Sequence, residues 1–186
     1  IQDGTHFSPS TSGDDYKYVT SKNIRMGYMD LTDCATISAE EHEKIYSRCD
    51  VKKRDLLLTK DGANTGNVAL NHLEEEFSLL SSVALLRADE EKCKPEFLLQ
   101  FMMSQHASTQ IDLLMSGNAI TRLTLEKIKK ISACLPPLGE QEKIADILTS
   151  LDDQIEAVES KLVQLESLKK SLMGDLLTGR VRVSVD

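Results

Sequence analysis

The sequence contains no tryptophan, and aromatic residues occupy only 4% of its 186 positions. Its apolar runs all fall short of the roughly 20 residues that a membrane-spanning helix requires. The first residues lack the basic start and the apolar stretch of a signal peptide. There is no initiator methionine either, so we expect the chain to begin inside a longer polypeptide. These absences predict a cytoplasmic protein with a modest aliphatic core and no membrane partner.

The cysteines and histidines do not form a recognisable ligand set. The four cysteines, at positions 34, 49, 93 and 134, include no Cys-x-x-Cys pair, and the four histidines are scattered along the chain. The sequence therefore predicts neither a zinc site nor any other metal site. Two disulfides are possible by number alone, but without a secretory signal we expect free thiols in a reducing cytoplasm.

Motifs of nucleotide hydrolases and methyltransferases are also missing. There is no Gly-Lys-Ser/Thr loop to hold phosphates and no glycine-rich cofactor loop of a methyltransferase. Pro136-Pro137 is flanked by Leu135 and Leu138, which cannot orient an exocyclic amine as the Asn/Asp-Pro-Pro-aromatic motif of amino-methyltransferases does. No general acid, base or nucleophile is identified, so we expect a non-catalytic chain.

The net charge of −8 at neutral pH argues mildly against a nucleic-acid partner, because contacts to phosphate supply most of the affinity for DNA. The charges are clumped, however, so a fold that separates the clusters can still present a basic face. The acidic clusters are Glu40-Glu41-Glu43, Glu74-Glu75-Glu76 and Asp89-Glu90-Glu91, and the basic ones are Lys22 with Arg25, Lys52-Lys53-Arg54 and Lys127-Lys129-Lys130.

The most regular pattern lies after Pro136-Pro137, where apolar residues recur every three or four positions up to residue 177. This is the a/d heptad pattern of a coiled coil, and a helix over 140–177 would be roughly 57 Å long. No other segment is long enough to pair with it, so we expect a partner helix from elsewhere. The predicted interface consists of Ile144, Leu148, Leu151, Ile155, Val158, Leu162, Leu165, Leu172 and Leu176, with Lys169 as the one polar residue in the series.

The preceding residues predict an α+β fold, with a mostly β domain over 1–135 whose helices come late, followed by the long helix over 136–179 and a tail over 180–186. Ser38 followed by Glu41 is a capping box, and Pro95 is a typical first helical residue. Residues 1–15 read as a loop. Strands are expected at 16–20, 28–31, 56–59, 68–70, within 77–87 and at 131–135, and helices at 38–46, 95–105, 107–115 and 124–128.

Three polar segments of the first domain carry side chains that can bind base edges or phosphates. They are the turn 20–23, the glycine-containing loop 60–67, and the segment 116–122 with its single arginine. On composition alone, each is equally well described as an ordinary connection, and that alternative stays open. The candidate residues are Ser21, Lys22, Asn23, Lys60, Asn64, Thr65, Asn67, Asn118, Thr121 and Arg122.

Two stretches resemble the conserved helix of the DNA specificity (S) subunit of type I restriction–modification systems. They are Leu135-Pro136-Pro137-Leu138-Gly139-Glu140-Gln141-Glu142-Lys143-Ile144 and Leu176-Leu177-Thr178-Gly179-Arg180-Val181. The first domain resembles that family's target recognition domain in Asp3-Gly4-Thr5-His6, Tyr18-Val19-Thr20-Ser21-Lys22-Asn23-Ile24, Asp55-Leu56-Leu57-Leu58-Thr59-Lys60-Asp61-Gly62 and Gly117-Asn118-Ala119-Ile120. The family often has a glycine before the aspartate of the third motif, where this chain has Arg54.

The resemblance implies a subunit with two recognition domains and two helices that form an antiparallel coiled coil, each domain reading half of a bipartite site in double-stranded DNA. This chain carries one of each, so its helix is expected to pair with a second copy or with the missing half. A self-paired form would be two-fold symmetric and would read a symmetric split site. The three polar segments above are then the DNA-contacting loops.

The resemblance also implies partner subunits. Methyltransferase (modification) and endonuclease/translocase subunits would dock on the chain, and S-adenosylmethionine, ATP and Mg²⁺ would bind to them, with no cofactor in this chain. The alternative is a coiled-coil adaptor whose first domain binds protein, which the acidic net charge favours.

Overall fold

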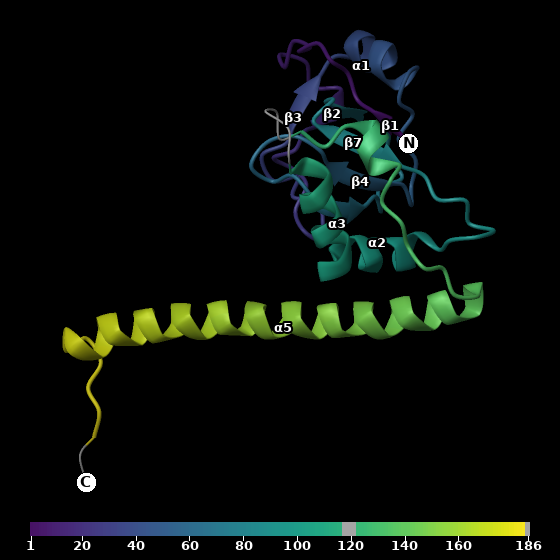
Figure 1. Cartoon of the computed structure of the whole chain (residues 1–186). Coiled ribbons are helices and arrows are strands. Elements are labelled where there is room, and N and C mark those ends of the chain that lie inside the picture. The colour runs from purple at the N-terminus through teal and green to yellow at the C-terminus, as the bar shows by residue number, and fades with distance from the viewer. Residues whose placement is uncertain (117–121, 185–186) are drawn as a thin grey trace. The chain divides into compact units, whose positions relative to one another are not determined.

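The computed structural model describes residues 1–116 and 122–184, which fall into two compact units (Figure 1). The first, Ile1–Ile144, is called the globular unit below, and the second, Ala145–Asp186, is called the arm. The globular unit extends past the predicted boundary at 135 because it includes the first turns of the last helix. The helices are α1 (Ala39–Tyr46), α2 (Pro95–Met103), α3 (Gln105–Met115), α4 (Leu125–Ile128) and α5 (Leu138–Leu177).

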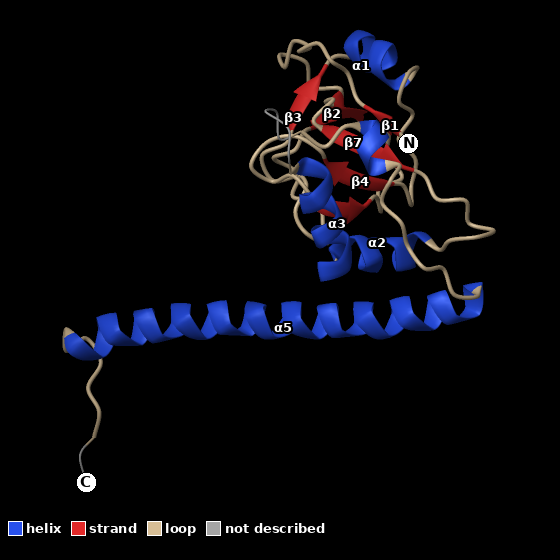
Figure 2. Cartoon of the chain, viewed as in Figure 1, coloured by secondary structure: helices blue, strands red, loops and turns tan. Residues whose placement is uncertain are grey.

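Two small sheets form the globular unit, which confirms the predicted α+β class (Figure 2). In the first, the strand order is β1-β7-β4-β5 and all neighbours are antiparallel; in the second it is β3-β2-β6, with β2 and β6 parallel. The strands are β1 (Gln2–Asp3), β2 (Tyr16–Val19), β3 (Ala35–Ile37), β4 (Leu56–Thr59), β5 (Val68–Leu70), β6 (Ser78–Leu79) and β7 (Val83–Leu86).

The four-stranded sheet is buried on both faces, which explains why β4 is a continuous apolar run rather than an alternating one. Leu56 and Leu58 point to one face and pack with residues of α2 and α3, such as Met102 and Ile111. Leu57 points to the other face, where it packs with Phe77 and with residues of the three-stranded sheet. The sheet is thus the middle layer of the unit.

The predicted helix starts are confirmed. The side chain of Ser38 accepts a hydrogen bond from the backbone N–H of Glu41 at 3.4 Å, and α1 follows directly. Pro95 begins α2, where its missing N–H costs nothing because the first helical N–H groups have no partner within the helix. Ser104 and Thr124 cap α3 and α4 in the same way.

Two of the expected strands are wrong, and two of the observed strands were not predicted. Residues 131–135 form no strand, because the backbone of Ser132 pairs with the side-chain amide of Gln110 in two hydrogen bonds of 2.9 Å rather than with a neighbouring strand. The expected strand 28–31 is reduced to a single bridge between Ile24 and Met29. The expected loop 1–15 contains β1, and β3 was not predicted.

The four cysteines are free, as expected. Cys49 is buried, and desolvation raises the pKa of its thiol to about 12. Desolvation also raises the thiol pKa of Cys34 and Cys93. These three thiols therefore stay protonated at neutral pH, and only Cys134 is exposed.

Helix α5 is continuous over 40 residues, which confirms the long C-terminal helix. Within the arm the predicted a/d residues are solvent-exposed, from 38% for Leu148 to 68% for Val158. Ile144 belongs to the globular unit and is partly buried. Among the described residues, no helix is long and apolar enough to cross a membrane.

Candidate nucleic-acid interface

The loop 60–67 connects β4 to β5. It contains two glycines in a backbone conformation that residues with a side chain rarely adopt. Gly62 and Gly66 have φ values of 96° and 98°, in the left-handed region. The N–H of Gly66 donates to the carbonyl of Thr59 at 2.8 Å, and the hydroxyl of Thr65 donates to the carbonyl of Gly62 at 2.7 Å. These bonds hold the loop in one compact shape at the end of the two strands.

The turn 20–23 is held by the side chain of Asn23. Its Oδ1 accepts from the backbone N–H of Thr20 at 3.0 Å, and its Nδ2 donates to the carbonyl of Asp30 at 3.1 Å. Asn23 is only 6% exposed. Its amide therefore shapes the turn from inside, and the contact of Asn23 with DNA stays a prediction.

The structure brings the predicted segments together. The Nδ2 of Asn64 donates to the carbonyl of Ser21 at 3.5 Å, so loop 60–67 touches turn 20–23. Arg122 pairs with Asp61 at 3.0 Å between Nη2 and Oδ2, which places Arg122 against the same loop. We call residues 20–23, residues 60–67 and Arg122 the loop cluster. Asn118 and Thr121 lie outside the described residues.

Lys60 does not reach the surface of the loop cluster. It is 3% exposed, and its Nζ lies 3.1 Å from Oδ2 of Asp3. The ammonium of Lys60 is buried and the carboxylate of Asp3 is partly buried, so removal of Asp3 would leave an uncompensated charge in the interior at a large desolvation cost. Lys60 thus connects the first family-like motif to the third through an internal ion pair, and its contact with DNA stays a prediction.

The first motif approaches the sheet too closely for a side chain at Gly4. A Cβ there would lie 1.9 Å from the carbonyl oxygen of Leu79. The N–H of Thr5 donates to that same carbonyl at 2.8 Å, and the carbonyl of Thr5 accepts from Ser81. Asp3-Gly4-Thr5 is therefore a structural motif, which places Asp3 to hold Lys60.

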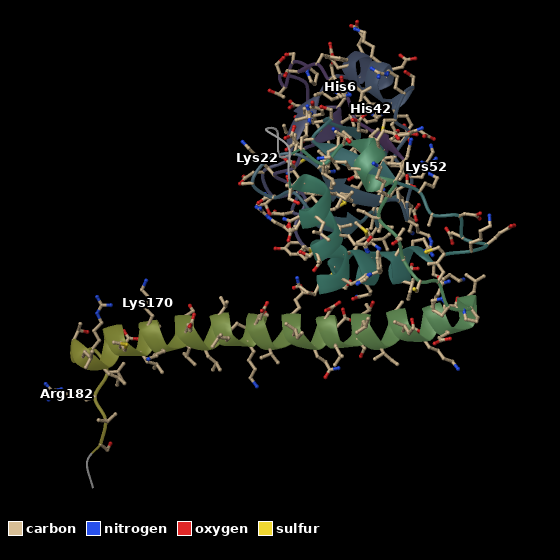
Figure 3. All side chains as sticks on the ribbon, in the orientation of Figure 1. His6, Lys22, His42, Lys52, Lys170 and Arg182 are labelled. Carbon is tan, nitrogen blue, oxygen red and sulfur yellow. The ribbon has the colours of Figure 1, made fainter. Side chains whose placement is uncertain are left out.

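The exposed members of the loop cluster are those able to contact a ligand. Lys22 is exposed and extends away from the globular unit (Figure 3), and among the described residues no carboxylate forms an ion pair with it. The Arg122 side chain is 41% exposed beside Asp61. Asn64, Thr65 and Asn67 are partly exposed, although the Nδ2 of Asn67 donates to the carbonyl of Ile24 at 3.1 Å.

The basic cluster 52–54 is not free to bind a polyanion. Lys53 pairs with Glu74, and the guanidinium of Arg54 pairs with Glu90 and Glu96. Lys52 differs from these two because its Nζ donates a hydrogen bond to the hydroxyl of Tyr46 at 2.9 Å and lies 3.8 Å from the carboxylate of Asp50. The acidic partners of residues 52–54 therefore neutralise most of the positive charge that made this cluster a candidate for binding phosphates.

Arg54 also explains the glycine that the resemblance leads one to expect. Its φ is 71°, the one positive value of a non-glycine residue in the described part of the chain. A side chain in that region is crowded against the following carbonyl, which a glycine avoids. This chain keeps the backbone shape without the glycine and adds ion pairs to Glu90 and Glu96.

Sequence reasoning missed two features. Arg25, Met26 and Tyr28 lie on the hairpin 24–29 next to the loop cluster, and of these only Arg25 had been singled out, as part of a basic cluster. The carboxylate of Asp30, which pairs with Arg25 at 3.4 Å, has a lowered pKa, first because Thr32 hydrogen-bonds to it. The pair therefore stays charged at neutral pH.

The second missed feature is Gln141, which is fully buried within the Pro-Pro-Leu-Gly-Glu-Gln stretch. Its Oε1 accepts from the N–H of Lys94 at 2.9 Å, and its Nε2 donates to the carbonyls of Lys92 at 2.9 Å and Pro136 at 2.8 Å. The side-chain amide thereby fixes the first turn of α5 to the segment before α2. Hydrogen bonds between residues so far apart in the chain leave no recognisable pattern in the local sequence.

Comparison with known proteins identifies relatives along most of the chain. The model of the type I restriction modification DNA specificity domain matches residues 5–167. The MjaVIII specificity subunit of Methanocaldococcus jannaschii is 26% identical over 188 residues, 98% of this chain and 44% of that protein. The EcoKI specificity subunit of Escherichia coli K12 is 26% identical over 175 residues, 90% of this chain and 36% of that protein.

Solved structures show the same fold. The HsdS subunit of Thermoanaerobacter tengcongensis superposes with a TM-score of 0.62 at 19% identity, covering 85% of this chain and 41% of that one. A chain from a study of complex assembly and conformational transition of the type I R-M system gives a TM-score of 0.66 at 18% identity, covering 92% and 45%. This chain spans less than half the length of each of these relatives.

Proposed function

The chain belongs to the family of type I restriction–modification DNA specificity domains, and from this premise we propose that it is the DNA-reading, non-catalytic part of such a system. The observation that carries the proposal is the loop cluster. Segments that are about 40 to 100 residues apart in the sequence meet at one surface, with Lys22 and Arg122 exposed there. Cations that position a protein on phosphates, beside amide and hydroxyl groups that bind base edges, are the two components of sequence readout.

The acidic net charge is compatible with this proposal because of where the acids lie. Glu74 pairs with Lys53 and Glu75 pairs with Lys17. Glu90 is held by Arg54. These carboxylates are thus neutralised locally by cations that are not part of the loop cluster. Asp61 within the loop cluster and Asp30 beside turn 20–23 also have arginine partners, which reduces their repulsion of a phosphate backbone.

The arm extends the proposal to the assembly. Its exposed heptad stripe would pair with a second helix, from another copy or from the remainder of the specificity subunit, and would act as a spacer between two recognition domains. The globular unit would then read one half of a bipartite target. Methyltransferase and endonuclease subunits would dock on the paired helices and supply S-adenosylmethionine, ATP and Mg²⁺.

The proposal is tested by fluorescence anisotropy with a random-sequence duplex at low salt, with the full chain bound to its modification subunit. We expect Lys22→Ala and Arg122→Ala each to weaken binding several-fold and to reduce the slope of log affinity against log salt by about 0.9 per lost phosphate contact. The matched control is Lys53→Ala, which removes an exposed lysine that lies outside the loop cluster, and it should leave both quantities unchanged.

Absence of binding by the unaltered complex would contradict the proposal and favour the adaptor alternative, in which the globular unit binds protein. Equal losses for Lys22→Ala and Lys53→Ala would also count against it, because the effect would then follow net charge rather than position.

A further inference from the structure

The hairpin 24–29 presents apolar side chains next to the loop cluster, and nothing in the proposed function so far uses them. Tyr28 is 61% exposed and Met26 is 46% exposed. Single exposed apolar residues are common on proteins and need no explanation. Two on one hairpin that also carries Arg25 and follows Lys22 are a different case, because these cations also attract a polyanion to that surface.

The hairpin is rigid at its base. The N–H of Arg25 donates to the carbonyl of Tyr28 at 2.9 Å, and Ile24 is fully buried between the strands. The carbonyl of Ile24 accepts from Asn67 of loop 60–67, so the hairpin and that loop are one connected surface. The backbone that carries the exposed side chains is therefore held in place before any ligand arrives, which lowers the entropy cost of binding.

The turn of the hairpin is fastened to the edge of the four-stranded sheet. Gly27 has φ of 90°, and its N–H donates to the carbonyl of Val68 in β5 at 2.8 Å. A Cβ on Gly27 would lie 3.2 Å from the methyl group of Met103 in α2. Gly27 thus lets the turn sit close to the sheet edge, and Met26 and Tyr28 on either side of it remain in solvent.

The cations around the hairpin attract a polyanion, and a DNA duplex is the polyanion that the proposed function supplies. Arg25 lies within the hairpin, and Lys22 precedes it without a carboxylate partner among the described residues. The apolar group that a B-form duplex offers to such a surface is the C5-methyl of thymine in the major groove, and apolar side chains are its usual contacts.

We propose that Tyr28, supported by Met26, contacts the methyl group of a thymine and so selects one base pair of the target. This inference rests on the proposed function, and it adds a residue-level source of specificity that the polar loops do not supply. Lys22 and Arg122 position the complex on phosphates irrespective of sequence, whereas Tyr28 discriminates.

The test begins with selection from a randomised duplex pool by the full chain bound to its modification subunit. We expect Tyr28→Ala to lose preference at one thymine of the enriched sequence while the other positions persist. Tyr28→Phe, which keeps the ring, should retain the preference. The matched control is Phe7→Ala, which removes another exposed aromatic of the globular unit, outside the hairpin and the loop cluster.

A second measurement removes the methyl group from the DNA instead of the ring from the protein. Deoxyuridine in place of that thymine should weaken binding of the unaltered protein about fourfold, the contribution of one buried methyl, and should leave binding of Tyr28→Ala unchanged. Identical enriched sequences for the unaltered protein and Tyr28→Ala would overturn the inference while leaving the proposed function intact. Failure of the unaltered complex to enrich any sequence would overturn both.

Discussion

The globular unit and the arm treat their leucines in opposite ways. In β4, Leu56, Leu57 and Leu58 are completely buried, because helices cover one face of the sheet and a second sheet covers the other. In the arm, Leu151 and Leu162 are 50% and 55% exposed although they recur with strict heptad spacing. The same residue type thus completes a core in one unit and leaves an unpaired surface in the other. A regular apolar stripe without its own cover identifies the part of the chain that requires a partner.

The largest expected effect is on the association of the arm. Leu151→Asp with Leu162→Asp places two charges in the a/d stripe, and burial of an unpaired charge between helices is strongly unfavourable. We expect the parent chain to self-associate through the arm and the double variant to be monomeric, with the dissociation constant raised by about 1000-fold or more. Light scattering over a concentration series measures this.

Ser160→Asp with Ser167→Asp is the matched control, because it adds the same charges on the opposite side of the helix. It should leave association unchanged. A parent chain that stays monomeric at all concentrations tested would exclude self-pairing and leave the remainder of the specificity subunit as the mate of α5.

A smaller effect is expected at Gln141, in the part of α5 that belongs to the globular unit. Gln141→Leu keeps the volume but leaves the N–H of Lys94 and the carbonyls of Lys92 and Pro136 without their partner. Unsatisfied buried groups of this kind cost about 2–3 kcal/mol of unfolding free energy, measurable by urea denaturation. Amide exchange at Lys94 should also accelerate.

Gln154→Leu is the control for this change, since the amide of Gln154 is exposed and bonds only to the carbonyl of Ser150 in its own helix. It should be nearly neutral.

The smallest effect is expected at Arg54, inside the globular unit. Arg54→Ala keeps the left-handed backbone and loses the ion pairs to Glu90 and Glu96, and exposed pairs contribute only about 0.2–1 kcal/mol each. Arg54→Gly loses the same pairs and also relieves about 1 kcal/mol of backbone strain. We therefore expect the glycine variant to be the more stable by about 1 kcal/mol in urea denaturation. Equal stability of the two would show that Arg54 occupies its conformation without strain.

The two basic clusters differ in a property that the sequence could not predict, namely whether their cations have acidic partners. Lys52-Lys53-Arg54 and the pair Lys22 with Arg25 looked alike in the sequence. The fold places Glu74, Glu90 and Glu96, all distant in the chain, beside the first cluster, whereas Lys22 has no such partner among the described residues. Ion pairing between distant segments depends on the fold and has no local pattern.

The sequence predicted the segments of the candidate site but not which of their side chains are exposed. The polar turns were visible because glycine, asparagine and lysine mark them locally. That Asn23 and Lys60 point inward, and that Arg25, Met26 and Tyr28 share the surface with Lys22, depends on the pairing of β4 with β5 and on the ion pair between Lys60 and Asp3.

By itself, the sequence determined the long helix, the capped starts of α1 and α2, the buried strand β4 and the family, because each of these depends on periodicity or on a motif within a few residues. Only the tertiary structure decided which polar residues are internal, which cations remain free and how Gln141 attaches α5 to the globular unit. The physical reason is that burial and ion pairing are set by residues far apart in the chain, whereas helical periodicity and caps are set by near neighbours.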